Sequence, residues 1–163
     1  MRYNVAVLGG GPAGTAAALQ AARAGAKTLL VERYGFLGGN ATGALVNPWM
    51  GHAWADPHTR QPGSLIGGIF REIVLALRAR GAYGAPCDRA AFDEQQLKLV
   101  YDTVLAAAGV TVRLHSLLIA AQIENDRIAT VDVFGKGGAQ RVAADVFIDA
   151  TGDGDLAALA GCS

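Results

Sequence analysis

The residues best suited to chemistry in this chain are three glycines near its start and an acid that follows them. Gly9, Gly11 and Gly14 stand in G-x-G-x-x-G spacing. In that pattern the first glycine allows a tight turn, the second lets a pyrophosphate approach the backbone, and the third lets a helix pack closely on a strand. Glu32 lies 18 residues after Gly14, where a carboxylate can accept hydrogen bonds from a ribose and would repel a 2′-phosphate. The spacing predicts a bound dinucleotide whose ribose hydroxyls are free.

Two predicted strands and a helix surround these glycines and can position them. Residues 5–8 and 28–31 are short apolar runs, typical of strands buried on both faces. Residues 13–24 are rich in alanine and favour a helix, with Pro12 in its first turn and Gly25 as its stop. The helix N-terminus supplies N–H donors and partial positive charge to phosphates. A lone glycine pattern also occurs in turns that bind nothing, but the strand, helix, strand and acid around this one favour the dinucleotide.

A second glycine-rich stretch follows the second strand. Residues 38–43 read Gly-Gly-Asn-Ala-Thr-Gly, a loop that can bring main-chain N–H groups against an anion or a flat ring, with an ordinary surface loop as the alternative. Residues 47–52 are aromatic and apolar, and they either line a substrate pocket or form a buried packing loop. His52 is the only candidate acid or base in that stretch, and no catalytic residue is assigned.

The composition is that of a globular protein with a substantial core. The chain has 163 residues, of which 52% are hydrophobic, and its formal net charge is zero. This length suits one domain, and the charge balance excludes electrostatic capture of nucleic acid or of an anionic membrane. Cys87 and Cys162 form no C-x-x-C pair, and neither they nor His52, His58 and His115 show metal-ligand spacing.

The apolar start of the chain is interrupted where a targeting signal needs a continuous apolar core. Residues 9–14 include four glycines and a proline. A nucleotide site explains these residues, whereas a signal peptide or a membrane helix does not. We therefore expect a cytoplasmic protein with no membrane partner and no metal.

Two longer amphipathic helices are expected in the middle of the chain. The first runs from a Ser64 cap to about Arg80, because apolar residues recur there at helical spacing. The second runs from an Asp88 cap to about Ala108 and ends at Gly109. Their apolar faces are expected to pack in the core.

The last third of the chain is predicted to form strands that lead into a second glycine-rich turn. A short strand at 110–114 precedes three segments that are joined by hairpin turns, which indicates a three-stranded antiparallel β-meander. The three segments span residues 117–123, 128–134 and 140–143. A separate apolar strand at 146–148 ends in Asp-Ala-Thr-Gly-Asp-Gly-Asp, and a helix begins at Asp155.

In this order the motifs resemble the N-terminal part of FAD-dependent oxidoreductases with the glutathione-reductase-like fold. They are most similar to the broad FAD-dependent oxidoreductase family that is related to fumarate-reductase flavoproteins. The resemblance rests on the first glycine motif, the Glu-Arg pair before the Gly-Gly-Asn-Ala-Thr loop, the meander, and Ile-Asp-Ala-Thr-Gly-Asp-Gly-Asp. It implies an α/β, Rossmann-like FAD/NAD(P)-binding fold whose parallel sheet carries helices and a meander at about 117–143. It also implies FAD as the cofactor and transfer of hydride or electrons through the flavin.

The resemblance further implies which residues hold FAD. The pyrophosphate would be held by Gly9, Gly11, Pro12, Ala13 and Gly14. The segment that runs along the pyrophosphate and the ribityl side of FAD would consist of Gly39, Asn40, Ala41 and Thr42. A second backbone contact would come from Ala150, Thr151, Gly152 and Asp153. Glu32 would bind the adenosine ribose, and Arg33 would lie near the adenine. Either Leu117 or Leu118 would meet the adenine edge.

The chain departs from the resemblance in two ways. Disulfide reductases of this fold carry a redox cysteine pair after the Gly-Gly loop, whereas residues 40–47 contain no cysteine, so dithiol chemistry is excluded. Family members also continue well beyond the Ala-Thr-Gly turn, so the chain looks like roughly the N-terminal third of an enzyme. The expected partners are a small-molecule substrate or electron acceptor, with self-association or a missing C-terminal partner. The alternative function is an NAD(H)-binding module or a catalytically silent nucleotide-binding subunit.

Overall fold

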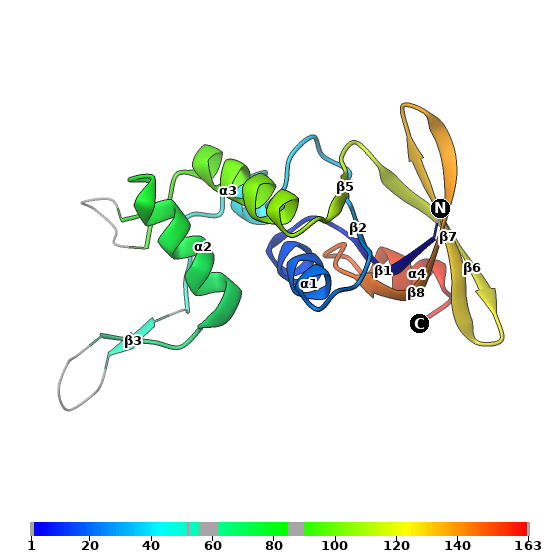
Figure 1. Cartoon of the computed structure of the whole chain (residues 1–163), viewed down its shortest axis with the longest axis horizontal. Helices are drawn as coiled ribbons and strands as arrows, with labels where there is room; N and C mark the ends of the chain where they lie inside the picture. Colours follow the sequence, from blue (N-terminus) through cyan, green and yellow to red (C-terminus); the bar gives the residue numbers. More distant parts are fainter. Residues whose placement is uncertain (1, 52, 56–61, 85–89, 163) are drawn as a thin grey trace.

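Six strands form one mixed sheet on which the rest of the molecule is built (Figure 1). The computed structural model describes residues 2–51, 53–55, 62–84 and 90–162. The sheet has the order β5-β2-β1-β8-β7-β6, and its strands are β1 (Arg2–Leu8), β2 (Thr28–Val31), β5 (Thr111–Arg113), β6 (Leu117–Glu124), β7 (Arg127–Gly135) and β8 (Gly138–Asp149). Strands β5, β2, β1 and β8 pair in parallel, whereas β8, β7 and β6 pair antiparallel. The predicted α/β class, with a parallel sheet and a three-stranded meander, is confirmed.

Strand β8 joins the meander to the parallel part of the sheet. Its residues from Gly138 to Ala143 pair with β7, and those from Ala143 to Asp149 pair with β1. The sequence predicts two separate strands here, and this is wrong because Asp145 does not interrupt the pairing. Its carboxylate accepts hydrogen bonds from the side chains of Arg2, at 2.5 Å, and Asn4, at 3.0 Å, without leaving the strand.

Each face of the parallel strands is covered by its own apolar cluster. On one face, helix α1 (Pro12–Arg23) packs on β1 and β2, and helices α2 (Gly68–Ala79) and α3 (Glu94–Ala107) extend this layer (Figure 1). The side chains buried there include Val7, Leu19, Leu30, Leu77 and Leu97. On the other face, the meander and helix α4 (Asp155–Leu159) cover a cluster that includes Leu8, Leu29, Val131, Val142 and Leu156. Both faces of β1 and β2 are therefore covered, which explains their uninterrupted apolar runs.

Helix α2 begins later than the sequence predicts. Ser64, the expected cap, belongs to a two-stranded ribbon of β3 (Ala53–Ala55) and β4 (Pro62–Ser64), and the helix starts at Gly68. Because pairing with β3 holds the chain extended at this point, the chain becomes helical only after the ribbon, although the amphipathic pattern starts earlier. Among the described helices, none combines the length and the apolar character that crossing a membrane requires.

Helix α3 also begins later than predicted, with Asp93 as its N-cap. The Asp93 carboxylate accepts the N–H groups of the second and third helical residues at 2.8 and 2.9 Å. A β-bridge between Tyr83 and Phe92 keeps the chain extended just before this cap. Asp88, the cap that the sequence predicts, lies outside the described residues.

The stretch from Asn47 to Trp49 packs inside the region of α2 and α3. The Asn47 side chain donates to the carbonyl of Phe92 and accepts the N–H of Phe92 at 3.1 Å. The Trp49 ring stacks on the Phe92 ring, with centroids 4.2 Å apart, and meets Phe70 edge-on at 5.1 Å. Of the two interpretations of residues 47–52, the packing loop therefore fits Asn47 to Trp49, whereas Met50 is 81% exposed and His52 lies outside the described residues.

Gly14 should be required by the fold itself. A Cβ atom there would overlap the carbonyl oxygen of Gly9. Gly14→Val should therefore lower the free energy of unfolding by about 1–3 kcal/mol through overpacking. Gly11 is the matched control, because its Cβ would meet nothing nearer than the Cα of Gly39 at 3.9 Å, and its φ of −69° suits any residue. Denaturant unfolding of Gly14→Val and Gly11→Val, followed by circular dichroism, compares the two. Equal midpoints would contradict this packing.

Candidate functional site

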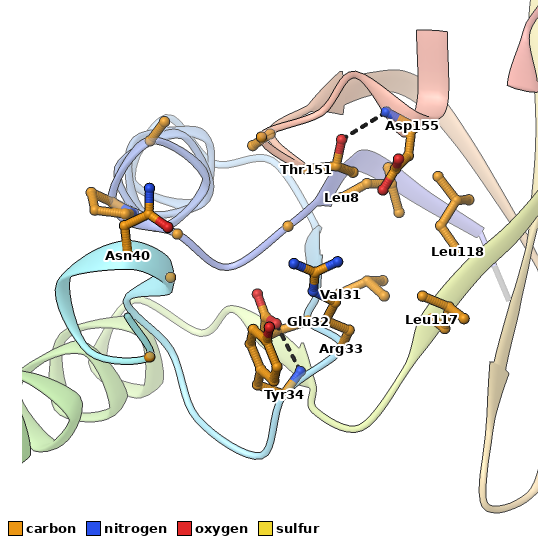
Figure 2. Close-up of a pocket in the computed structure, with 18 of the residues that line it drawn as sticks. Leu8, Val31, Glu32, Arg33, Tyr34, Asn40, Leu117, Leu118, Thr151 and Asp155 are labelled. Carbon is orange, nitrogen blue, oxygen red and sulfur yellow. Dashed lines mark hydrogen bonds between the residues drawn. The ribbon is translucent and has the colours of Figure 1, made fainter. Parts of the chain in front are cut away.

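A cavity of about 410 Å³ opens at the carboxyl ends of β1, β2 and β8 (Figure 2). In open α/β sheets this edge is the usual place of a ligand. Its walls come from the loop after β1, from residues 31–44 and from the turn after β8, while residues 116–118 at the start of the meander also contribute. Figure 2 shows Asn40 on one side of the cavity, Leu118 on the other and Glu32 between them. Segments far apart in the sequence thus converge on one site.

The loop after β1 passes close to the turn after β8, and it needs glycine to do so. Gly9 has a φ of +102°, and a Cβ atom there would overlap the carbonyl of Ala150. The Gly9 N–H donates to the carbonyl of Val31 at 2.8 Å, and the Ala150 N–H donates to the carbonyl of Leu8 at 2.8 Å. The loop enters α1 at Gly11, which lines the cavity and has room for a side chain. The fold therefore does not require glycine at position 11, whereas a phosphate against the α1 N-terminus does.

Glu32 lies buried at the end of β2, with 5% of its surface exposed, and lines the cavity. Its Oε2 accepts the N–H of Gly10 at 2.6 Å, and its Oε1 accepts the N–H of Tyr34 at 2.8 Å. Because an ionised carboxylate has about four acceptor positions, about two remain for donors in the cavity, and ribose hydroxyls are donors of this kind. The same side chain holds the loop after β1 against the end of β2.

The glycine-rich loop after β2 contains the short 3₁₀ helix η1 (Gly39–Ala41) and lies against the first loop. The N–H of Gly38 donates to the carbonyl of Gly10 at 2.8 Å. Gly39 has a φ of +49°, and a Cβ atom there would come within 2.9 Å of the Cα of Gly11. Glycine at position 39 thus lets the two loops approach backbone to backbone.

The turn after β8 is shaped by Asp149. Its carboxylate accepts the N–H of Thr151 at 3.1 Å, the Thr151 hydroxyl at 2.8 Å and the N–H of Ala157 at 3.0 Å. The Thr151 Oγ in turn accepts the N–H of Asp155 at 2.8 Å (Figure 2). Partial desolvation raises the pKa of Asp149, but hydrogen bonds from Ala157 and Thr151 outweigh it, so this pKa lies below its ordinary value. The acid therefore organises the turn while ionised.

Two stacked aromatic rings lie between two cations on the way from the cavity towards α3. The Arg33 guanidinium lies 5.0 Å from the centroid of the Tyr34 ring, and that ring stacks on Phe36 at 5.7 Å with an interplanar angle of 8°. The Lys98 ammonium lies 4.0 Å from the centroid of Phe36. Arg33 and Tyr34 line the cavity. They give it a flat, cationic surface that suits an aromatic base.

Most of the residues that the sequence singles out meet at this cavity. Those that line it are Gly9, Gly11, Pro12, Ala13, Glu32, Arg33, Gly39, Asn40, Leu118, Ala150, Thr151 and Gly152. Leu117, the alternative to Leu118, and Gly43, the last residue of the predicted glycine-rich loop, line it as well. Residues that sequence reasoning missed also line it, namely Leu8, Val31, Tyr34, Ala44, Ser116 and Asp155. Two of these had a signal in the sequence, because Tyr34 follows the Glu-Arg pair and Asp155 begins a helix beside a glycine-rich turn.

Four of the predicted residues do not line the cavity. Gly14 packs under the first loop, where a side chain would overlap Gly9. Ala41 and Thr42 are buried behind the second loop, and the Thr42 hydroxyl donates to the carbonyl of Leu37 at 2.6 Å. Asp153 is exposed outside the cavity.

The fold and the cavity define an α/β protein with a ligand-sized cavity at the ends of its parallel strands. The family described as FAD dependent oxidoreductase matches residues 4–163, and the chain belongs to this family. FAD is therefore its cofactor, as the sequence predicts. No curated protein matches the chain in sequence.

Solved structures share the fold at low sequence identity. A geranylgeranyl bacteriochlorophyll reductase-like protein from Thermoplasma acidophilum has 22% identity and a TM-score of 0.62, over 98% of this chain and 42% of that one. THI4 from Thermovibrio ammonificans has 19% identity and a TM-score of 0.59, over 92% and 57%. L-proline dehydrogenase from P. horikoshii has 13% identity and a TM-score of 0.65, over 98% and 56%. The chain thus spans between 42% and 57% of these structures.

Asp149 should make stability depend on pH in the acid range. Because its pKa is lowered in the fold, its contribution is fully present above the ordinary aspartate pKa of about 3.9 and is lost as the pH falls through the lower folded value. Thermal midpoints of the wild type and Asp149→Asn should therefore differ most above about pH 4 and converge at lower pH. Asp153→Asn, an exposed position in the same turn, is the control and should change the midpoint little. A difference in thermal midpoint that stays the same at all pH values would contradict this role of Asp149.

Proposed function

We propose that this chain is the FAD-binding part of a flavin-dependent oxidoreductase and that the cavity at the strand ends receives the cofactor. The observation that carries the proposal is the position of Gly11, Glu32 and Gly39. Gly11 leaves room beside the N-terminus of α1, and Glu32 keeps acceptor positions free. Gly39 lets the loop after β2 lie against the loop after β1. A dinucleotide needs space for its phosphates, acceptors for its ribose hydroxyls and a backbone that side chains do not cover.

The residues around the cavity suggest how the parts of FAD are divided among them. The pyrophosphate would be held by the backbone of Gly9, Gly11, Pro12, Ala13 and Gly39. The adenosine ribose would lie on Glu32 and the adenine beside Arg33, Tyr34 and Leu118. The turn at Ala150, Thr151 and Gly152 would supply the contact from β8. Ala41 and Thr42 would act indirectly by holding the second loop from behind.

Bound FAD supplies the chemistry of hydride or electron transfer, while the protein contributes binding, orientation and exclusion of water. The covered faces of β1 and β2 keep the strand ends rigid, so the backbone donors hold their direction. The family implies a small-molecule substrate or electron acceptor. Cys162 is an exposed free thiol, which supports a reducing compartment such as the cytoplasm.

Titration with FAD of the wild type and Gly11→Val tests the proposal. A valine side chain would occupy the space beside the α1 N-terminus, so FAD binding should fall at least about 100-fold while circular dichroism stays unchanged. Flavin fluorescence or calorimetry measures the affinity. If folded Gly11→Val binds FAD as the wild type does, the phosphates lie elsewhere and the proposal fails.

Glu32 should contribute to affinity through its remaining acceptor positions. Glu32→Gln keeps the size of the side chain but replaces one acceptor by a donor, so FAD should bind about 10- to 150-fold more weakly, corresponding to about 1.5–3 kcal/mol for a charged hydrogen bond. Glu124→Gln, an exposed acid of the meander, is the matched control. Unfolding curves of both variants separate lost binding from lost stability. Unchanged FAD affinity in Glu32→Gln would remove Glu32 from the ribose site.

A further inference from the structure

Thr15 is a buried polar residue of helix α1 that does not line the cavity at the strand ends. None of its surface is exposed, and its hydroxyl donates to the carbonyl of Gly10 at 3.2 Å. A threonine inside a helix usually bonds to a carbonyl three or four residues earlier in the same helix. Here the acceptor lies five residues earlier, in the loop that precedes α1. The hydroxyl therefore ties the loop after β1 to the helix that follows it.

Gly10, the acceptor of this hydrogen bond, is held at both of its backbone polar groups. Its N–H donates to Oε2 of Glu32 at 2.6 Å, and its carbonyl also accepts the N–H of Gly38 at 2.8 Å. Gly10 is buried, and a Cβ atom there would come within 2.5 Å of the Leu37 side chain. Three partners from different parts of the chain thus fix the orientation of this residue, and Thr15 is one of them.

The carbonyl of Gly10 determines the direction of the next N–H group along the chain, that of Gly11. The peptide bond between the two glycines is planar and trans, so the N–H points opposite to the carbonyl. The carbonyl points towards Thr15 and Gly38, neither of which lines the cavity, whereas Gly11 does line it. Within the described part of the chain, no hydrogen bond takes up the N–H of Gly11. This N–H is therefore turned away from Thr15 and remains available to a ligand.

We propose that Thr15 is a positioning residue for the cofactor, whose hydroxyl holds the Gly10 carbonyl so that the Gly11 N–H is directed at the diphosphate group of FAD. The inference rests on the proposed function, because it takes the space beside Gly11 to be the place of the phosphates. A donor that is already oriented binds an anion more tightly than one that must first be ordered. Thr15 acts on affinity in this way without touching the ligand.

Removal of the Thr15 hydroxyl can be separated from a general loss of folding. In Thr15→Val the Gly10 carbonyl keeps the N–H of Gly38 as a donor, so no buried carbonyl is left without a hydrogen bond. Valine has nearly the shape of threonine, and the packing around position 15 should be retained. The peptide between Gly10 and Gly11 loses one of the two donors that orient it.

The test is a titration of the full chain with ADP and with adenosine, which share the nucleoside but differ in the diphosphate. Thr15→Val should weaken ADP binding about 5- to 10-fold, as expected for one lost hydrogen bond, and should leave adenosine binding within about twofold. Thr15→Ser keeps the hydroxyl and should restore ADP binding. Thr103→Val is the matched control, because the Thr103 hydroxyl also donates to a helix carbonyl, that of Leu99 at 2.6 Å, on the exposed side of α3. It should change neither affinity.

A second measurement follows the peptide itself in the ligand-free protein. By ¹⁵N relaxation dispersion, the Gly11 amide of Thr15→Val should show exchange on the microsecond to millisecond timescale that the wild type and Thr103→Val lack. Equal losses of ADP and adenosine binding, or a Gly11 amide as rigid as in the wild type, would reduce Thr15 to a structural role and overturn the proposal. A wild type that binds ADP no more tightly than adenosine would instead refute the phosphate site of the proposed function, and this proposal with it.

Discussion

The site depends on loops that meet backbone to backbone with no side chain between them. Gly9 passes the carbonyl of Ala150, and Gly39 passes Gly11, at distances that a Cβ atom would not permit. Hydrogen bonds from Gly9 to Val31 and from Gly38 to Gly10 fix this approach. A side chain of any size would push the segments apart and widen the cavity. The walls are therefore positioned by the main chain, which the two apolar clusters of the sheet hold in place.

Two acids at the ends of parallel strands organise the loops that follow them. Glu32, at the end of β2, accepts the N–H of Gly10 in the loop after β1 and the N–H of Tyr34 in its own loop. Asp149, at the end of β8, accepts the N–H and the hydroxyl of Thr151 and binds the first turn of α4. Glu32 lies inside the cavity and keeps acceptor positions for a ligand, whereas Asp149 lies outside it and acts through the turn. In both loops a carboxylate accepts backbone N–H groups. Glu32 also faces the cavity, whereas Asp149 only positions the turn after β8.

The first strand–helix–strand unit, the meander and both glycine-rich turns could be predicted from sequence, because their signals are local. Glycine spacing, apolar runs and an acid at a strand end each report on a few neighbouring residues. The starts of α2 and α3 could not be predicted, since pairing of β3 with β4 and of Tyr83 with Phe92 overrides the helical pattern. The continuity of β8 was missed for the same reason, because partners on β1 satisfy Asp145 within the strand. Ser116, which has no such local signal, lines the cavity only because distant segments of the chain meet there.

The position of β1 in the middle of the sheet has a consequence for the order in which the protein can fold as it is made. One neighbour of β1, the strand β2, follows it closely, but the other, β8, ends at Asp149. At roughly 5–20 residues per second, a ribosome needs on the order of 6–24 s to extend the chain from the end of β2 to the end of β8. During that time the edge of an apolar central strand stays unpaired and open to other nascent chains. The emerging chain therefore carries an edge that can mispair until β8 is complete.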